Sequence, residues 1–202
     1  MDITYLGGGS VRLSGRLLNI ETDPEEDKKV AADVVLCTTD TQFKKSEGMI
    51  INGPGEYEVK EAMISGVPTH LHTDDTGSAP KGTAYLIDID DVSVVILGNV
   101  APELSNEQLE VLGGADVLVV PVGGHGLTLD STAAAQIVSQ IEPKYIVPVH
   151  YDDGATQYAM PQDSLDKFFK EVGASPEPIT KLKINAKEMP QETTVVALEL
   201  QK

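Results

Sequence analysis

The stretch DVLVVPVGGHGLTLDSTAAAQIVSQIEPKYIVPV, residues 116–149, places a helical pattern between two apolar runs. DVLVVPV (116–122) and YIVPV (145–149) are continuous apolar runs of strand length, which is typical of strands buried on both faces. Asp130 is a good N-cap, and apolar residues recur at helical spacing after it, at Ala133, Ala134, Ile137, Val138 and Ile141. The stretch therefore predicts a strand–helix–strand unit.

Two further helices are predicted on either side of this unit. Ser105 and Gln108 have the spacing of a capping box, and this pattern predicts a short helix through Leu112 that ends at Gly113. Another helix is expected to begin at Asp163 or Ser164 and to end at Gly173, with apolar residues at Leu165, Phe168, Phe169 and Val172. Two more strands are expected near KLKIN and TTVVALEL.

The first half of the chain is a series of strands and turns. DITYL, VRLSGRLLNIET, DVVLCT, MIING, GTAYLIDID and VSVVILGN all have strand patterns, and a turn is expected at Asp90 and Asp91. PGEYEVKEAMISGV alternates as one half-buried strand does. Antiparallel strands followed by strand–helix units predict an α/β (α+β) protein, a single domain over residues 1–202 with sheets inside and helices outside. A four-layer αββα sandwich accommodates this pattern, although spacing alone does not select it.

Composition excludes several classes of function. Fifteen basic and thirty-two acidic side chains give a formal charge of −17, which disfavours nucleic-acid and membrane-surface partners. No apolar stretch approaches the length of a spanning helix, and the opening residues do not have the pattern of a signal peptide. A single cysteine, Cys37, lies within an apolar run and is expected to be buried. We therefore expect a cytoplasmic protein.

The four histidines all lie at or beside predicted strand ends, where α/β folds place their sites. They are His70, His72, His125 and His150, and no two have a tight zinc-binding spacing. Each could serve a site or could simply be a hydrogen-bonded structural residue. The glycine-rich segments at 7–9 and 123–126 lack the lysine of a phosphate loop, so turn geometry is the better interpretation. Asp130 is interpreted as a helix cap rather than an acid–base group.

Several motifs together resemble the metallo-β-lactamase-fold hydrolases, in the branch related to ascorbate-6-phosphate lactonase. They are MDITYLG, INGPGEYEV, GTAYLIDID, LGN, LSNEQLEVLGGADVLVVPVGG, TLD and IVPVHY, which extend over roughly residues 1–151. The resemblance implies an αββα sandwich with metal at one edge between the two sheets. It also implies hydrolysis of lactones, phosphodiesters, amides or thioesters by one or two zinc ions.

The zinc ligands that the resemblance implies are mostly replaced in this sequence. The family's motif after the strand DVVLCT would place histidines at Thr39, Thr41 and Lys44 and an aspartate at Phe43; only Asp40 matches. A further histidine falls on Gly8 and the bridging aspartate on Asn99, whereas His150 and either His72 or His70 are retained. The family's early Asp-Pro is Asp23-Pro24. Catalytic zinc usually takes three protein ligands, so the usual hydrolytic chemistry is not expected here.

Two hypotheses follow. In the first, the protein is a metal-free pseudoenzyme or a binding or regulatory protein that takes a small-molecule ligand in the ancestral cleft and has no cofactor. In the second, it is a hydrolase of a lactone, phosphodiester or other ester, with a reorganised mono-metal or metal-free site built on His72, His125 and His150, to which Asp23 or Asp40 could be added. The candidate catalytic residues are His150, His125, Asp40 and Asn99, and the candidate metal ligands are His72 and His150. Zinc is expected only in the second hypothesis, and an oligomer is compatible with both.

Overall fold

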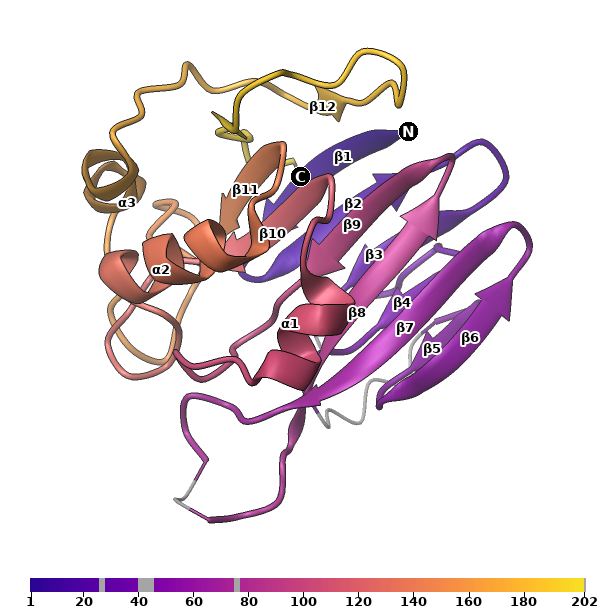
Figure 1. The fold of residues 1–202 in the computed structure, drawn as a ribbon, viewed down its shortest axis with the longest axis horizontal. Coiled ribbons are helices and arrows are strands. Elements are labelled where there is room, and N and C mark those ends of the chain that lie inside the picture. Colours follow the sequence, from indigo (N-terminus) through magenta and orange to yellow (C-terminus); the bar gives the residue numbers. More distant parts are fainter. Residues whose placement is uncertain (26–27, 40–45, 75–76, 202) are drawn as a thin grey trace.

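Two β-sheets stacked face to face form the centre of the computed structural model (Figure 1). The structure describes residues 1–25, 28–39, 46–74 and 77–201. One sheet has six strands in the order β12-β1-β2-β3-β4-β5, and the other has seven in the order β13-β11-β10-β9-β8-β7-β6. The first sheet contains β1 (Asp2–Gly7), β2 (Ser10–Ser14), β3 (Asn19–Thr22), β4 (Val34–Leu36), β5 (Met49–Ile51) and β12 (Leu182–Lys183). The second contains β6 (Gly55–Val59), β7 (Ala62–Thr69), β8 (Gly82–Ile89), β9 (Val92–Ile96), β10 (Val117–Pro121), β11 (Tyr145–Val149) and β13 (Thr194–Val195).

The helices lie outside the sheets, as the strand–helix pattern predicts. α1 (Asn106–Leu112) contacts β8, α2 (Ser131–Ile141) contacts β10, and α3 (Leu165–Val172) contacts α2. In Figure 1, α1 and α2 lie across the outer face of the seven-stranded sheet. The predicted sandwich of two sheets with helices outside is confirmed.

The predicted strand–helix–strand unit is present, and strand pairing, helix capping and side-chain burial account for it. β10 and β11 are parallel, with Val117 opposite Tyr145 and Pro121 opposite Val149. Between them, the Asp130 side chain accepts a hydrogen bond from the Ala133 amide and caps α2, as predicted. α2 buries Ala134, Ile137 and Ile141 against the sheet, and each large aliphatic side chain buried in this way contributes about 1.5–3 kcal/mol.

The other two helices also begin and end where the sequence indicates. Ser105 and Gln108 form the predicted capping box of α1, which ends at Gly113. α3 begins after Ser164 and ends at Gly173, whose φ of 67° is in the left-handed region. Local capping chemistry therefore sets these boundaries.

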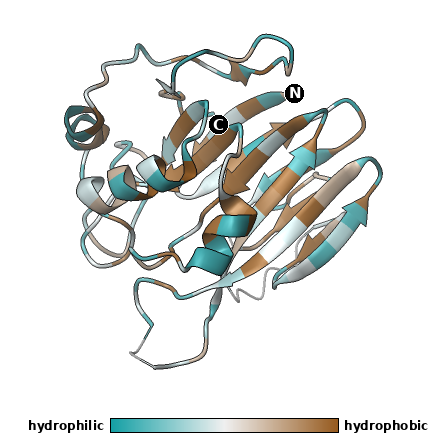
Figure 2. Cartoon of the chain, viewed as in Figure 1, coloured by the Kyte–Doolittle hydropathy of each residue, from teal (hydrophilic) through white to brown (hydrophobic). Residues whose placement is uncertain are grey.

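The main core lies between the sheets and under the helices. Ile3, Tyr5, Val11 and Leu13 point inward from β1 and β2 and are buried. Figure 2 shows hydrophobic bands along the strands and hydrophilic colour on the exposed parts of the helices. A smaller apolar cluster covers the outer face of β4, where Val35 and Cys37 pack against the preceding segment through Val30 and Ala32. Cys37 is buried, as predicted.

One strand prediction is wrong. PGEYEVKEAMISGV forms the hairpin β6–β7 rather than a single alternating strand, and Val59 pairs with Ala62 across the turn. Lys60 adopts a φ of 55° in that turn. The two-residue turn at Lys60 and Glu61 shifts the alternation by one residue, so the inward-facing positions change from odd numbers in β6 to even numbers at the start of β7.

The final residues close both sheets. β12 pairs antiparallel with β1, and β13 pairs parallel with β11, so the two strands expected near KLKIN and TTVVALEL are present but only two residues long each. Within the part of the chain that the structure describes, no helix has the length and apolar character needed to cross a membrane.

Candidate functional site

A polar pocket of about 190 Å³ lies where strand ends from both sheets meet. Asp23 follows β3, Thr38 follows β4, Asn99 follows β9 and His150 follows β11. β3 and β4 are parallel, and so are β9, β10 and β11, so their carboxyl ends are brought to one edge of the sandwich. The lining residues are Gly9, Asp23, Pro24, Thr38, Thr39, Asn99 and His150.

Asp23 is held in the pocket by Thr38. The Thr38 amide donates to Asp23 Oδ1 and the Thr38 hydroxyl donates to Oδ2, both at 2.7 Å. Burial raises the pKa of the Asp23 carboxyl to about 6, against the opposing effect of the two Thr38 hydrogen bonds. The residue as a whole is half-buried because part of it faces the pocket. A carboxyl group in this state exchanges protons near neutral pH.

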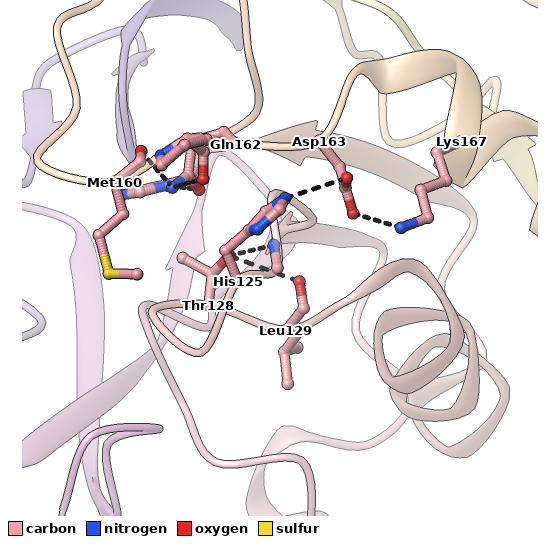
Figure 3. A network of polar contacts seen from close by, with 10 residues as sticks. His125, Thr128, Leu129, Met160, Gln162, Asp163 and Lys167 are labelled. Carbon is pink, nitrogen blue, oxygen red and sulfur yellow. Dashed lines mark hydrogen bonds and ion pairs between the residues drawn. The ribbon is translucent and has the colours of Figure 1, made fainter.

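His150 is fixed by its backbone and by one ring nitrogen. Its amide donates to the Gly8 carbonyl at 2.7 Å, and its Nδ1 lies 3.2 Å from Gln162 Oε1. Gln162 Nε2 donates to the carbonyls of Met160 and Pro161, so its Oε1 is left to accept (Figure 3). The proton of a neutral His150 therefore sits on Nδ1, and Nε2 carries the lone pair. Burial lowers the pKa of His150, which keeps the ring neutral.

A tyrosine supports the His150 ring from the side. The ring centroids of Tyr158 and His150 are 4.9 Å apart with an interplanar angle of 43°. Tyr158 donates its hydroxyl to the Tyr151 carbonyl at 2.8 Å. The segment that carries Tyr158 is anchored by Asp153, which accepts from the amides of Ala155 and Thr156. His150 is thus held in one orientation.

Backbone strain is concentrated at this edge of the molecule. Asp23, His150 and the nearby loop residue His125 have φ values of 41°, 52° and 58°, in the left-handed region that non-glycine residues rarely adopt. Such conformations cost of order 1–3 kcal/mol each and cluster at functional sites. The strain at Asp23 and His150 marks the pocket as a site rather than an incidental gap.

The structure brings together only some of the predicted site residues. Asn99 and His150 both line the pocket. His125 is not among its lining residues: its side chain is 43% exposed, and its Nε2 lies 3.2 Å from Asp163 Oδ1, while Lys167 contacts the other carboxylate oxygen, Oδ2 (Figure 3). Asp40 lies outside the described residues, as do Thr41, Phe43 and Lys44.

His72 lies beside the pocket residue Asn99 without lining the pocket itself. Its amide donates to the Asn99 carbonyl at 3.0 Å. Its Nδ1 is buried and has no hydrogen-bond partner among the described residues. His70, the alternative to it, is half exposed and lies 3.7 Å from Asp74.

The described residues do not fit a zinc centre. Nowhere in the described ranges do three His, Cys, Asp or Glu side chains gather in a group that could hold a metal ion. Among the described residues that line the pocket, Asp23 is the one carboxylate and His150 the one imidazole, and Asn99 and Thr39 stand at positions where the resemblance implies metal ligands. Catalytic zinc usually takes three protein ligands, all stronger donors than an amide or a hydroxyl.

Several pocket residues were missed by the sequence analysis. Asp23 was noted in an Asp-Pro pair and as an optional member of the reorganised site, but it was not among the candidate catalytic residues, although it follows a buried strand as Thr38 does. Gly9 was interpreted only as a turn residue. Gln162 carried no signal, because it reaches His150 from an irregular segment whose path depends on tertiary contacts such as the hydrogen bond from the Asp163 amide to the Gly123 carbonyl.

Residues 2–150 match the family model described as the β-lactamase superfamily domain. A UPF0173 metal-dependent hydrolase from Pyrococcus horikoshii is 30% identical over 111 residues, which cover 54% of this chain and 49% of the relative. A UPF0173 metal-dependent hydrolase from Thermococcus onnurineus is 32% identical over 111 residues, with the same shares covered. The chain spans about half the length of the curated relatives it matches.

Solved structures resemble this chain over a greater length. A Thermotoga maritima protein assigned to the zinc-dependent hydrolases of the metallo-β-lactamase superfamily is 29% identical, with a TM-score of 0.80 and 99% of both chains covered. A metallo hydrolase from Ignicoccus hospitalis is 17% identical, with a TM-score of 0.66 and 91% of this chain and 99% of that chain covered, and it shares the fold.

Proposed function

This chain belongs to the β-lactamase superfamily, and we propose that it is a metal-free member that binds a small polar molecule in the pocket between Asp23 and His150. The observation that carries the proposal is the composition of the pocket. A buried carboxylate and a neutral imidazole face a cavity in which the other polar side chains, among the residues that the structure describes, are Thr38, Thr39 and Asn99. These groups suit hydrogen bonding to a ligand better than they suit coordination of a dication.

The rigidity of the pocket supports a binding role. Thr38 fixes Asp23 and Gln162 fixes His150, so neither side chain has to lose much rotational freedom when a ligand binds. Pre-organisation of this kind reduces the entropic cost of association. Because the formal charge is −17, we retain the expectation that nucleic acids and membranes are not partners. Cytoplasmic location, a single domain and a place near ascorbate-6-phosphate lactonase also stay predictions.

A second candidate is a hydrolase with a reorganised site on His72, His125 and His150. The unpartnered, buried Nδ1 of His72 is the observation in its favour, because such an atom is usually paired with a ligand or water. The pairing of His125 with Asp163 away from the pocket favours the metal-free binding protein instead.

Metal analysis tests the proposal directly. Protein purified without added metal should contain well under one equivalent of zinc, manganese or iron by mass spectrometry, and a chelator should leave its melting temperature unchanged. Near-stoichiometric metal that is lost in His150→Ala and retained in His125→Ala would overturn the metal-free proposal. His125→Ala is the matched control because it removes an imidazole that does not line the pocket.

A further inference from the structure

We infer that the pocket selects a small primary ammonium compound, an inference that rests on the proposed binding function of the same pocket. Among its described lining residues, Asp23, Thr38 and His150 present hydrogen-bond acceptors, whereas Thr39 and Asn99 can both donate and accept. A ligand that fills such a pocket must bring donors, and an ammonium group brings three of them together with a positive charge. The following observations carry the inference.

The first acceptor is His150 Nε2. Gln162 Oε1 takes the Nδ1 proton, so the opposite edge of the neutral ring carries a lone pair. That edge faces the pocket: an ideal Cβ added to Gly9 would lie 3.9 Å from His150 Cδ2, the ring atom next to Nε2. A ligand at this place therefore meets an acceptor rather than an N–H donor.

The second acceptor is the Asp23 carboxylate. The same added Cβ at Gly9 would lie 3.7 Å from Asp23 Oδ2, so a single point in the space above Gly9 is within contact distance of both side chains. A carboxylate offers about four lone-pair sites, and Thr38 occupies two of them. Thr38 donates its hydroxyl proton to Asp23, so its oxygen can only accept from a ligand. One nitrogen with three N–H bonds can reach Asp23 and His150 together.

The third observation is the negative charge of the side chains that line the pocket. No lysine or arginine is among the described residues that line the pocket. Among these described residues, the Asp23 carboxylate has hydrogen bonds from Thr38 but no ion pair with a cation. A cationic ligand supplies the missing partner, whereas an anionic one would meet the carboxylate in a protein of formal charge −17.

The pocket, of about 190 Å³, has room for an ammonium group that carries a short carbon chain. Pro24 and the backbone of Gly9 form the less polar part of its wall, next to which such a chain can lie. A small amino alcohol is therefore a suitable probe of the pocket.

Calorimetric titration of the whole protein at neutral pH with three isosteric probes tests the inference. The probes are 2-aminoethanol, 1,2-ethanediol and glycolate, which share a hydroxymethyl end and carry an ammonium, a hydroxyl and a carboxylate at the other end. We expect 2-aminoethanol to bind at least tenfold more tightly than 1,2-ethanediol, and glycolate to bind most weakly. Asp23→Asn should weaken 2-aminoethanol binding at least tenfold and leave 1,2-ethanediol within about twofold. Asp130→Asn is the matched control, because it makes the same charge change at a helix N-cap that asparagine also fills well.

A second variant keeps the test decisive if Asp23→Asn does not fold. Gly9→Val places a side chain in the space between Asp23 and His150, where its Cβ alone would lie 3.7 Å from Asp23 Oδ2 and 3.9 Å from His150 Cδ2, and it should abolish binding of all three probes. Equal or tighter binding of 1,2-ethanediol or glycolate would overturn the ammonium inference and leave the metal-free binding proposal standing. Failure of all three probes would also overturn the inference. Stoichiometric bound metal would overturn the proposed function itself.

Discussion

Thr38 donates two hydrogen bonds to Asp23, one from its amide to Oδ1 and one from its hydroxyl to Oδ2, each 2.7 Å long. The pair joins the end of β4 to the end of β3, since Asp23 follows Thr22 and Thr38 follows shortly after Leu36. The carboxylate is thereby fixed at the floor of the pocket, where desolvation acts on its charge. This relationship makes stability depend on pH in a definite direction.

Asp23→Asn is expected to flatten part of the pH dependence of unfolding. Burial raises the pKa of Asp23 to about 6 in the folded protein, above the ordinary value of 3.8. A carboxyl with a raised pKa destabilises the fold when ionised, so this residue's penalty is largest at pH 7 and disappears as the pH falls toward 4. With allowance for its partial exposure to the pocket, the penalty amounts to about 1–3 kcal/mol.

Urea unfolding of both proteins at several pH values between 7 and 4 measures this effect. The free energy of unfolding of Asp23→Asn minus that of the unsubstituted protein should fall by about 1–3 kcal/mol across that range. A difference that is independent of pH would show that the Asp23 carboxyl titrates normally.

Gly98→Ala is expected to destabilise the fold more than Gly114→Ala. Both glycines have positive φ values, 66° and 72°, so alanine at either position costs about 1–2 kcal/mol from backbone strain. At Gly98 an added Cβ would also lie 2.5 Å from the Thr38 Cβ, whereas Gly114 has no neighbouring atom within 4 Å among the described residues. Overpacking adds about 1–3 kcal/mol at Gly98 alone.

Chemical denaturation of the two glycine variants separates the free-energy cost of backbone strain, which both share, from the cost of the steric clash with Thr38, which only Gly98→Ala has. Gly98→Ala should also weaken ligand binding, because it displaces the residue that holds Asp23. Equal losses of stability in the two variants would mean that Thr38 moves aside without cost.

Gln162→Leu is expected to change the tautomer of His150. The Gln162 Oε1 contact at 3.2 Å stabilises the proton on Nδ1, and its removal frees the ring to carry the proton on Nε2. Nitrogen NMR of labelled histidine should show mostly Nδ1–H in the unsubstituted protein and an increased Nε2–H population in the variant. Gln136→Leu, on the exposed side of α2, is the control and should leave the spectrum of His150 unchanged. An unchanged tautomer in Gln162→Leu would show that a group other than Gln162 determines which nitrogen of His150 carries the proton.

Asp153→Ala is expected to loosen the segment that carries Tyr158. Asp153 accepts four hydrogen bonds, from the amides of Ala155 and Thr156 and from the hydroxyls of Thr156 and Tyr5. Their loss should reduce the free energy of unfolding by about 2–4 kcal/mol, because hydrogen bonds to charged groups contribute about 1.5–3 kcal/mol each and are not additive. Tyr5→Phe removes one of the four and should cost about 1–2 kcal/mol.

Thermal and urea unfolding compare the Asp153 and Tyr5 variants. A loss in Tyr5→Phe as large as in Asp153→Ala would show that the backbone amides find other acceptors. In that case Asp153 would serve Tyr5 alone rather than the whole segment.

The helices could be predicted from the sequence because their signals are local. The capping box of Ser105 and Gln108, the Asp130 cap and the left-handed Gly173 each act within one turn of the helix that they bound. The β6–β7 hairpin was missed because a local signal was overlooked. The inward-facing positions change from odd to even numbers between Val59 and Ala62, as a two-residue turn requires.

The site could be predicted only where the family motif marks it. Asn99 and His150 were named from aligned motifs, and both line the pocket. Gln162 and Tyr158 act on His150 from an irregular segment that follows β11, and their positions depend on long-range contacts that leave no periodic pattern. The family motifs therefore predicted residues at strand ends, but they did not predict the contacts that orient the His150 ring.

The pairing of β12 with β1 has a consequence for how the chain folds. Asp2 lies opposite Lys183, and the Gln201 amide donates to the Tyr5 carbonyl at 2.9 Å. One edge of β1 is thus covered by residues that lie far away in the sequence. Until these long-range pairs form, that edge presents unpaired backbone groups, so refolding should be slow and partly folded chains should aggregate at high protein concentration.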